Sequence, residues 1–189
     1  MKYLTIILTI LILFSCTNSR EVNKTKNGLG ELEIDFVTYN DCVIVCEAID
    51  LKIIAQKVFP NASIITFDET YAFPKFEWMV YKFVPEYLKM LKENNIDKWT
   101  PQFDCDDYSS LFKMEVQKAY SRNALDHQGI AVGTIIYFTE GWESESHAIN
   151  VVFSIGDDNK LGCLSIEPQN GSLVNPKDFS ADMVWLVIL

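Results

Sequence analysis

Three side chains of this sequence have the types and the chain order of a nucleophilic catalytic site. Cys105 lies in the segment DCDDY, His147 in SHAINVV and Glu167 in IEP. A cysteine nucleophile needs a base that takes its proton, and the base needs a group that orients it. Because a cysteine, a histidine and a carboxylate follow one another here, we consider these three as the candidate catalytic residues.

The elements predicted around these residues would bring them together. Cys105 begins a helix expected over residues 105–124, where apolar residues recur at intervals of three and four. The start of a helix lowers the pKa of a cysteine thiol. His147 begins a predicted strand, 147–155, and Glu167 ends the next one, 162–167. The two side chains would meet if the register places them on the same face of a sheet.

The rest of the chain alternates between helical and strand patterns. Helices are predicted over 50–59 and from Pro74 to about Asn94, with Pro85 kinking or splitting the second one. Further strands are predicted over residues 32–36, 63–67, 130–139 and 183–189. Helices followed by an antiparallel sheet indicate an α+β fold.

Composition limits the class of protein. The chain has 189 residues, 49% of them hydrophobic and 22% charged, which excludes a disordered chain and suits a sizeable core. The formal net charge of −10, from 26 acidic and 16 basic residues, argues against a nucleic-acid partner. Only two histidines are present, so a His-rich metal site is excluded. Of the two, His127 lies in a predicted loop and is expected to be exposed, which favours His147.

The N-terminus has the features of a bacterial lipoprotein signal. An apolar run from Leu4 to Phe14 follows a single lysine and is too short to span a bilayer. The sequence LFSC at 13–16 resembles a lipobox, whose cysteine is lipidated and becomes the mature N-terminus. We therefore predict a signal peptide over 1–15, a tether over 16–30, and a lipid anchor on Cys16 that holds the exported protein at the cell envelope. The alternative is an ordinary signal peptide in which Cys16 has no role.

Residues 31–189 are expected to form a single domain, because no internal repeat and no second linker follow Gly30. Its first part, 31–95, has mixed helical and strand patterns and no recognised motif. Its second part, 96–189, contains the predicted catalytic helix and sheet.

The segments around the three candidates resemble a known family. DCDDY, SHAINVV and IEP are similar to the C-terminal domain of the Marasmius oreades agglutinin, a papain-like, calcium-activated cysteine protease, and the spacings of 42 and 20 residues are similar too. More distantly, DCDD resembles bacterial transglutaminase-like cysteine peptidases. The resemblance covers about residues 95–170 and leaves no counterpart of the agglutinin's lectin domain. It implies a papain-like fold with Cys105 as nucleophile, His147 as general base and acid, and Glu167 as the orienting carboxylate.

Each candidate also has a plainer interpretation. A free cysteine is commonly a small buried hydrophobe. His147 alone would be a core or edge histidine, and Glu167 alone an ordinary charge at a strand end. The catalytic interpretation therefore depends on the three residues together.

The acidic residues around Cys105 create an electrostatic problem. Asp104, Asp106 and Asp107 oppose thiolate formation, because nearby negative charges raise the pKa of a thiol. Asp104 would offset part of this effect as the helix cap, and a bound cation would reverse the local field. Clustered carboxylates suit calcium, and the resembled family is calcium-activated. The candidate calcium ligands are Asp106, Asp107, Glu143 and Glu145. The alternative is that these residues are solvated acids without a ligand.

An acyl-transfer site also needs a donor for the oxyanion. Gln102, three residues before Cys105, is the nearest polar side chain, and the backbone N–H of Cys105 is a second candidate. Papain-like enzymes place their glutamine further upstream, so the spacing of Gln102 departs from that pattern.

Three other cysteines, Cys42, Cys46 and Cys163, form an odd set. Export permits disulfides, and Cys42 would pair with Cys46 if the segment bends. Cys163 is expected to be buried and free.

The sequence therefore predicts a lipid-anchored cysteine hydrolase that acts on peptide or amide bonds, with a peptide or protein substrate, a membrane anchor and calcium as activator. Two other functions stay open. One is a non-catalytic surface lipoprotein that binds peptide, glycan or protein. The other is a transglutaminase-like acyl transferase or a peptidoglycan peptidase.

Overall fold

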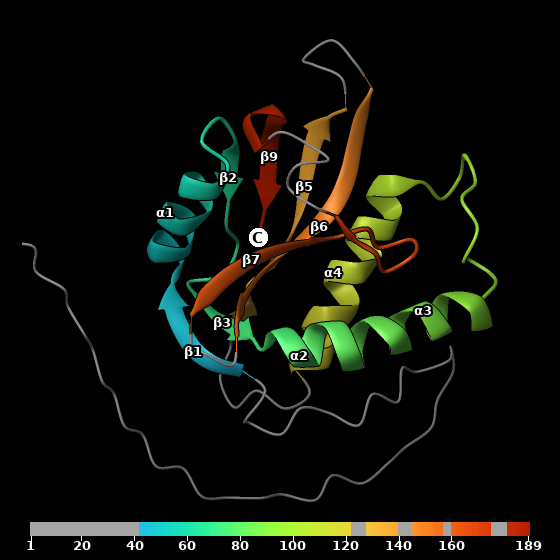
Figure 1. Cartoon of the computed structure of the whole chain (residues 1–189), viewed down its shortest axis with the longest axis horizontal. Helices are drawn as coiled ribbons and strands as arrows, with labels where there is room; N and C mark the ends of the chain where they lie inside the picture. The colour runs from blue at the N-terminus through green and yellow to red at the C-terminus, as the bar shows by residue number, and fades with distance from the viewer. Residues whose placement is uncertain (1–41, 122–127, 140–144, 157–159, 175–180) are drawn as a thin grey trace, which may run out of the picture.

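The structure is a computed structural model that describes residues 42–121, 128–139, 145–156, 160–174 and 181–189 (Figure 1). The predicted signal peptide, the tether and strand 32–36 lie outside the described residues. Among the helices that the structure describes, none is both long and apolar enough to cross a membrane.

The main sheet has six strands in the order β2-β9-β5-β6-β7-β8. Their bounds are β2 Ser63–Ile65, β5 Val132–Phe138, β6 Ser146–Ile155, β7 Leu161–Ile166, β8 Leu173–Val174 and β9 Val184–Ile188. Neighbouring strands are antiparallel except for β2 and β9, which are parallel. The predicted strands of the second half are therefore confirmed, and with them the α+β class.

A smaller sheet has the order β1-β3-β4, with β1 Cys42–Glu47, β3 Thr70–Pro74 and β4 Gly129–Ile130. Strand β1 was not predicted, because its sequence CVIVCE lacks the alternation of a half-buried strand. The prediction that Pro74 opens a helix is wrong, since Pro74 ends β3 opposite Cys42. Strand β4 pairs with β3 only at Tyr71 and Ala72, so the missing N–H of Pro74 interrupts no bond to β4.

The helices of the described residues are α1 Ala48–Val58, α2 Phe76–Trp78, the π-helix η2 Met79–Phe83, α3 Val84–Glu93, α4 Cys105–Ser121 and the short 3-10 helix η3 Ala181–Met183. Residues 76–93 form one continuous helical segment, in which Pro85 is the second residue of α3. The N–H of Val84 bonds to the carbonyl of Met79, five residues back. This wider turn accommodates the proline ring and its missing donor, so Pro85 changes the helix type instead of ending the helix.

The six-stranded sheet separates two apolar clusters, with α1 on one side and α3 and α4 on the other (Figure 1). Strand β6 contributes to both, because Val152 packs with α4 while Ile149, Val151 and Phe153 pack with α1. The predicted buried face of α4 is confirmed. Its Phe112 ring lies 5.2 Å from the ring of Phe83 in η2, and this contact holds α4 against the preceding helical segment.

The cysteines outside the candidate site form no disulfide in the described part of the chain. Cys46 is a free thiol in β1. An extended strand separates residues four apart by about 13 Å, well beyond the reach of a disulfide. The bend that a disulfide between Cys42 and Cys46 would require is therefore not present in β1. Cys163 in β7 is free and partly buried, and burial raises its pKa to about 12.

Candidate active site

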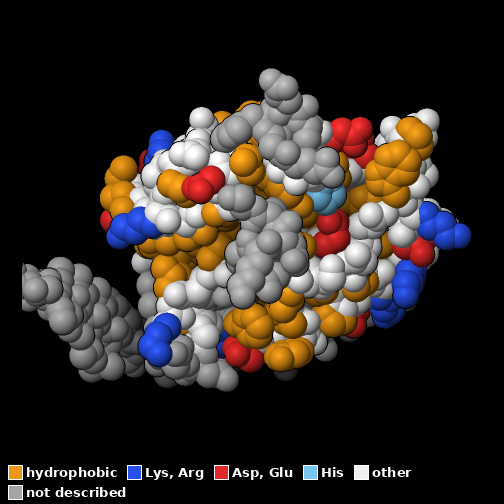
Figure 2. Space-filling model, turned by 45° about the horizontal axis from the view of Figure 1, so that its top comes forward, with side chains coloured by type: hydrophobic (Ala, Val, Ile, Leu, Met, Phe, Trp, Pro, Cys, Tyr) orange, Lys and Arg blue, Asp and Glu red, His pale blue; other side chains and the backbone are white. Residues whose placement is uncertain are grey.

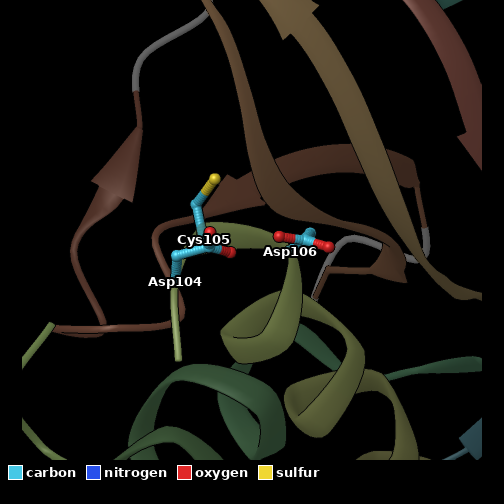
Figure 3. Close-up of side chains that lie close together, drawn as sticks. All are labelled: Asp104, Cys105 and Asp106. Carbon is cyan, nitrogen blue, oxygen red and sulfur yellow. The ribbon is translucent and has the colours of Figure 1, made fainter. Parts of the chain in front are cut away.

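Helix α4 begins at Cys105, whose sulfur points away from the helix toward the sheet (Figure 3). Asp107 caps the helix start, because its Oδ2 accepts a hydrogen bond of 3.3 Å from the backbone N–H of Asp104. The predicted cap, Asp104, does not have that role in the described structure. Its Oδ1 is buried without a hydrogen-bond partner among the described residues.

The surroundings of Cys105 have opposing effects on its thiol. Burial raises the pKa of Cys105, and the charges of Asp104 and Asp106 raise it further. Hydrogen bonds from the backbone N–H groups of Ala148 and of Cys105 itself lower it, but the net effect is a raised pKa. The electrostatic problem expected from the sequence is therefore present.

His147 and Glu167 are joined directly. The Nε2 atom of His147 lies 2.8 Å from Oε2 of Glu167, and Oε1 of Glu167 accepts the backbone N–H of Gln169 at 3.3 Å. The ring of Tyr137 contacts the imidazole edge-on, with centroids 5.7 Å apart. The His147 side chain is 31% exposed, and Figure 2 shows a histidine at the surface beside acidic side chains. The imidazole is thus held by one nitrogen, and Nδ1 is the nitrogen that Glu167 leaves for another group.

Strand β6 connects Cys105 with His147, because the backbone N–H of Ala148, the residue after His147, bonds to the Cys105 sulfur. Side chains alternate along a strand, so His147 lies on the Ile149 face, whereas α4 packs on the opposite face. The pairing of β7 with β6 ends at Ile166 and Asn150, and Pro168 has no N–H with which to extend it. Ala148 lies two residues before Asn150 in β6, beyond the end of this pairing. Its N–H is therefore free of β7 and bonds to the Cys105 sulfur.

The described structure leaves the predicted oxyanion donor Gln102 without a contact to the site. Thr100 and Phe103 exchange two backbone hydrogen bonds, of 3.2 and 3.0 Å, and Gln102 is exposed in the tight turn between them. Its role stays a prediction. The second candidate oxyanion donor, the backbone N–H of Cys105, forms a hydrogen bond with the Cys105 sulfur.

Carboxylates gather beside the sulfur, but not all of those predicted. Asp104, Cys105 and Asp106 each have a ligand atom within 4.8 Å of the others, and the two carboxylates lie side by side (Figure 3). A hydrogen bond with Asp104 raises the pKa of Asp106. Of the other predicted ligands, Asp107 and the exposed Glu145 are outside this group, and Glu143 lies outside the described residues. The carboxylate next to Asp106 is therefore that of Asp104, which was predicted as the helix cap and not as a calcium ligand.

A turn that the sequence analysis did not connect with catalysis holds Glu167. The N–H of Glu167 bonds to Ser172 and its carbonyl accepts the N–H of Gly171, at 2.9 and 2.8 Å. Gly171 has a positive φ of 74°. A Cβ on Gly171 would lie 2.7 Å from Val84 Cγ1 and 2.8 Å from Leu88 Cδ1, so the turn packs directly on α3. The dipeptide Asn170-Gly171 was the available signal for this turn.

The fold is similar to part of two solved structures. The complex of PSL1a with E64 has 17% sequence identity and a TM-score of 0.58, and the match covers 77% of this chain and 51% of PSL1a. Polyporus squamosus lectin, bound to a human-type influenza-binding epitope, has 17% identity and a TM-score of 0.50, over 74% of this chain and 48% of the lectin. The chain thus spans about half the length of each. No protein-family model matches the sequence, and no curated protein matches it. At this identity the likeness shows a related, agglutinin-like fold alone, and the papain-like character that the resemblance implied stays a prediction.

We expect Gly171→Ala to destabilise the protein by about 2–4 kcal/mol, because the substitution adds backbone strain and a clash with α3. The measurement is urea unfolding. Gly162→Ala is the matched control, since a Cβ there meets only Ser154 O, at 3.9 Å, and we expect a change within about 0.5 kcal/mol. Equal stability of the two variants would contradict the role given to the 167–172 turn.

Proposed function

We propose that this protein is a cysteine hydrolase that cleaves peptide or amide bonds. One observation carries the proposal, namely the 2.8 Å contact between His147 Nε2 and Glu167 Oε2. The next residue, Ala148, bonds through its N–H to the sulfur of Cys105 at the start of α4. A carboxylate on one ring nitrogen fixes the tautomer and leaves the other nitrogen to exchange a proton with the nucleophile.

The reaction that these groups support is acyl transfer. Nδ1 of His147 takes the thiol proton, and the Cys105 sulfur attacks the substrate carbonyl carbon. As the sulfur bonds to carbon and loses its negative charge, it releases the backbone N–H of Cys105, which then donates a hydrogen bond to the negative carbonyl oxygen. The imidazolium, stabilised by Glu167, returns the proton to the leaving nitrogen as the C–N bond breaks. Water then hydrolyses the thioester, releasing the acid and restoring the thiol. If an amine replaces water, the same site becomes an acyl transferase.

We propose calcium as the activator. The buried and unpaired Oδ1 of Asp104, next to the Asp106 carboxylate, is the type of oxygen that calcium binds, whereas the sulfur is a poor ligand for it. Asp104 and Asp106 would hold the ion. The chemistry it supplies is positive charge, which reduces the repulsion between these carboxylates and a thiolate on Cys105.

A second candidate function is glycan binding without catalysis, and the likeness to a lectin with a bound glycan favours it over hydrolysis. This chain spans about half of that lectin, so the glycan-binding part of the lectin need not be the part that is shared. Binding of the Neu5Aca2-6Galb1-4GlcNAc epitope to the full chain by calorimetry, unaffected by Cys105→Ala, would support this alternative.

We also propose that Cys16 carries a lipid that anchors the exported protein to the cell envelope, on the evidence of the sequence alone. In bacteria, Cys16→Ser should move the protein from the membrane fraction to the soluble fraction. Cys42→Ser is the control and should stay with the membranes. Equal membrane association of both variants contradicts the anchor.

We expect Cys105→Ala to abolish hydrolysis of a peptide library and labelling by E64, a thiol-reactive epoxide, because the substitution removes the nucleophile. Peptide mass spectrometry locates the label. Cys163→Ala is the control and should retain activity, since the raised pKa of Cys163 makes it a poor nucleophile. Wild-type activity in Cys105→Ala would exclude the proposed mechanism.

Calcium should speed the alkylation of Cys105 by iodoacetamide at neutral pH, and a chelator should reverse the effect. Because the pKa of Cys105 is raised, little thiolate is present at neutral pH without the ion, and the rate should increase as the pH rises. Asp106→Asn should lose the response to calcium. Asp107→Asn, which changes the cap and not the carboxylate pair, should keep it. An unchanged rate in the wild type with and without calcium removes calcium from the mechanism.

A further inference from the structure

Three polar side chains are buried between α4 and the sheet, among residues of an apolar core. Ser109 in α4 and Asn150 in β6 are 0% exposed, and Thr134 in β5 is 7% exposed. The α4 residues on either side of this layer in the interface, Tyr108 and Phe112, belong to the apolar core.

Hydrogen bonds through these side chains connect three elements. Nδ2 of Asn150 donates to Ser109 O at 3.0 Å and to Gly133 O in β5 at 3.1 Å. Oγ of Ser109 donates to Thr134 Oγ1 at 2.8 Å and approaches Ile149 O at 3.3 Å. Asn150 is the residue that reaches α4 and β5 at once, because both of its amide hydrogens are used.

This polar layer lies directly next to the candidate active site. Ser109 is one helical turn after Cys105, and Asn150 is three residues after His147. Apolar side chains tolerate small sliding of a helix over a sheet, whereas hydrogen bonds of fixed length and angle do not. A bond between Ser109 and Asn150 therefore sets the position of Cys105 along β6.

The arrangement is costly for stability alone. Oδ1 of Asn150 is buried without a hydrogen-bond partner among the described residues. An unpaired buried oxygen costs about 1–3 kcal/mol, which offsets much of the stability that the two hydrogen bonds of Nδ2 contribute. A polar residue kept in such a place is better explained by the geometry it imposes.

We propose that Asn150 is a positioning residue that fixes the nucleophile helix α4 on strand β6 and thereby holds the Cys105 sulfur within reach of His147. This inference rests on the proposed cysteine chemistry. Asn150 itself touches neither the substrate nor the reacting atoms.

The test is Asn150→Leu in the full chain, with the alkylation of Cys105 by iodoacetamide measured by peptide mass spectrometry. We expect the rate at neutral pH to fall about tenfold, because even small displacements of a nucleophile are costly. We also expect the midpoint of the pH profile to rise, since the sulfur would lose the N–H of Ala148. A residue with only a structural role would lower the melting temperature and leave that midpoint unchanged.

Val116→Ala is the matched control, because Val116 is an apolar, fully buried residue in the same interface of α4. It should lower the stability and leave the alkylation rate and the midpoint as in the wild type. If Asn150→Leu does not fold, Thr134→Val, which removes the acceptor of Ser109 Oγ, is judged by the same measurements.

The inference is overturned if the folded variant alkylates like the wild type, or if Val116→Ala slows the reaction equally. These results differ from a failure of the proposed function. In that case E64 would not label Cys105 in the wild type, with or without calcium, and Cys105→Ala would hydrolyse the peptide library as the wild type does.

Discussion

The end of strand β7 at Ile166 leaves open the edge of β6 on which the proposed cysteine chemistry depends. His147 lies on one face of β6 and the helix carrying Cys105 packs on the other, so the proposed proton transfer has to pass around the edge of the strand. If β7 continued beyond Ile166, it would cover that edge and bond to Ala148. Pro168 prevents this, because it has no N–H. The segment IEP thus supplies the carboxylate for His147 and ends the strand that would block it.

The carboxylates beside Cys105 oppose the formation of a thiolate at this position. Burial and the charges of Asp104 and Asp106 raise the pKa of the Cys105 thiol, while two backbone N–H groups lower it. Since the acids are held by the same helix start that presents the sulfur, the fold cannot separate them from it. A positive charge between the carboxylates would resolve this conflict without moving the backbone, which is the reason for proposing a cation at the helix start.

The sequence allowed the elements that carry the site to be predicted, but not the contacts between them. The strands around His147 and Glu167 and the buried face of α4 follow from side-chain periodicity, which is a local property. Strand β1 lacks alternation, and Pro74 suits a strand end as well as a helix start. The pairing of Asp104 with Asp106, in place of Asp107, depends on which carboxylate caps the helix. The roles of Gly171 and Asn150 depend on α3 and β5, which are distant in sequence and whose position relative to these residues no local pattern specifies.

The contacts that hold His147 and Glu167 help to decide between the two proposed functions, hydrolysis and glycan binding without catalysis. Glu167 has both oxygens engaged, one by His147 and one by Gln169, and its turn needs a glycine at positive φ packed against α3. A shared fold with a lectin does not require any of these features, because a fold can carry unrelated functions. A partly exposed His–Glu pair adds little stability. Holding an imidazole in one orientation, with Nδ1 left for a helix-start cysteine, has a clear use in catalysis, and it is this orientation that the 167–172 turn maintains.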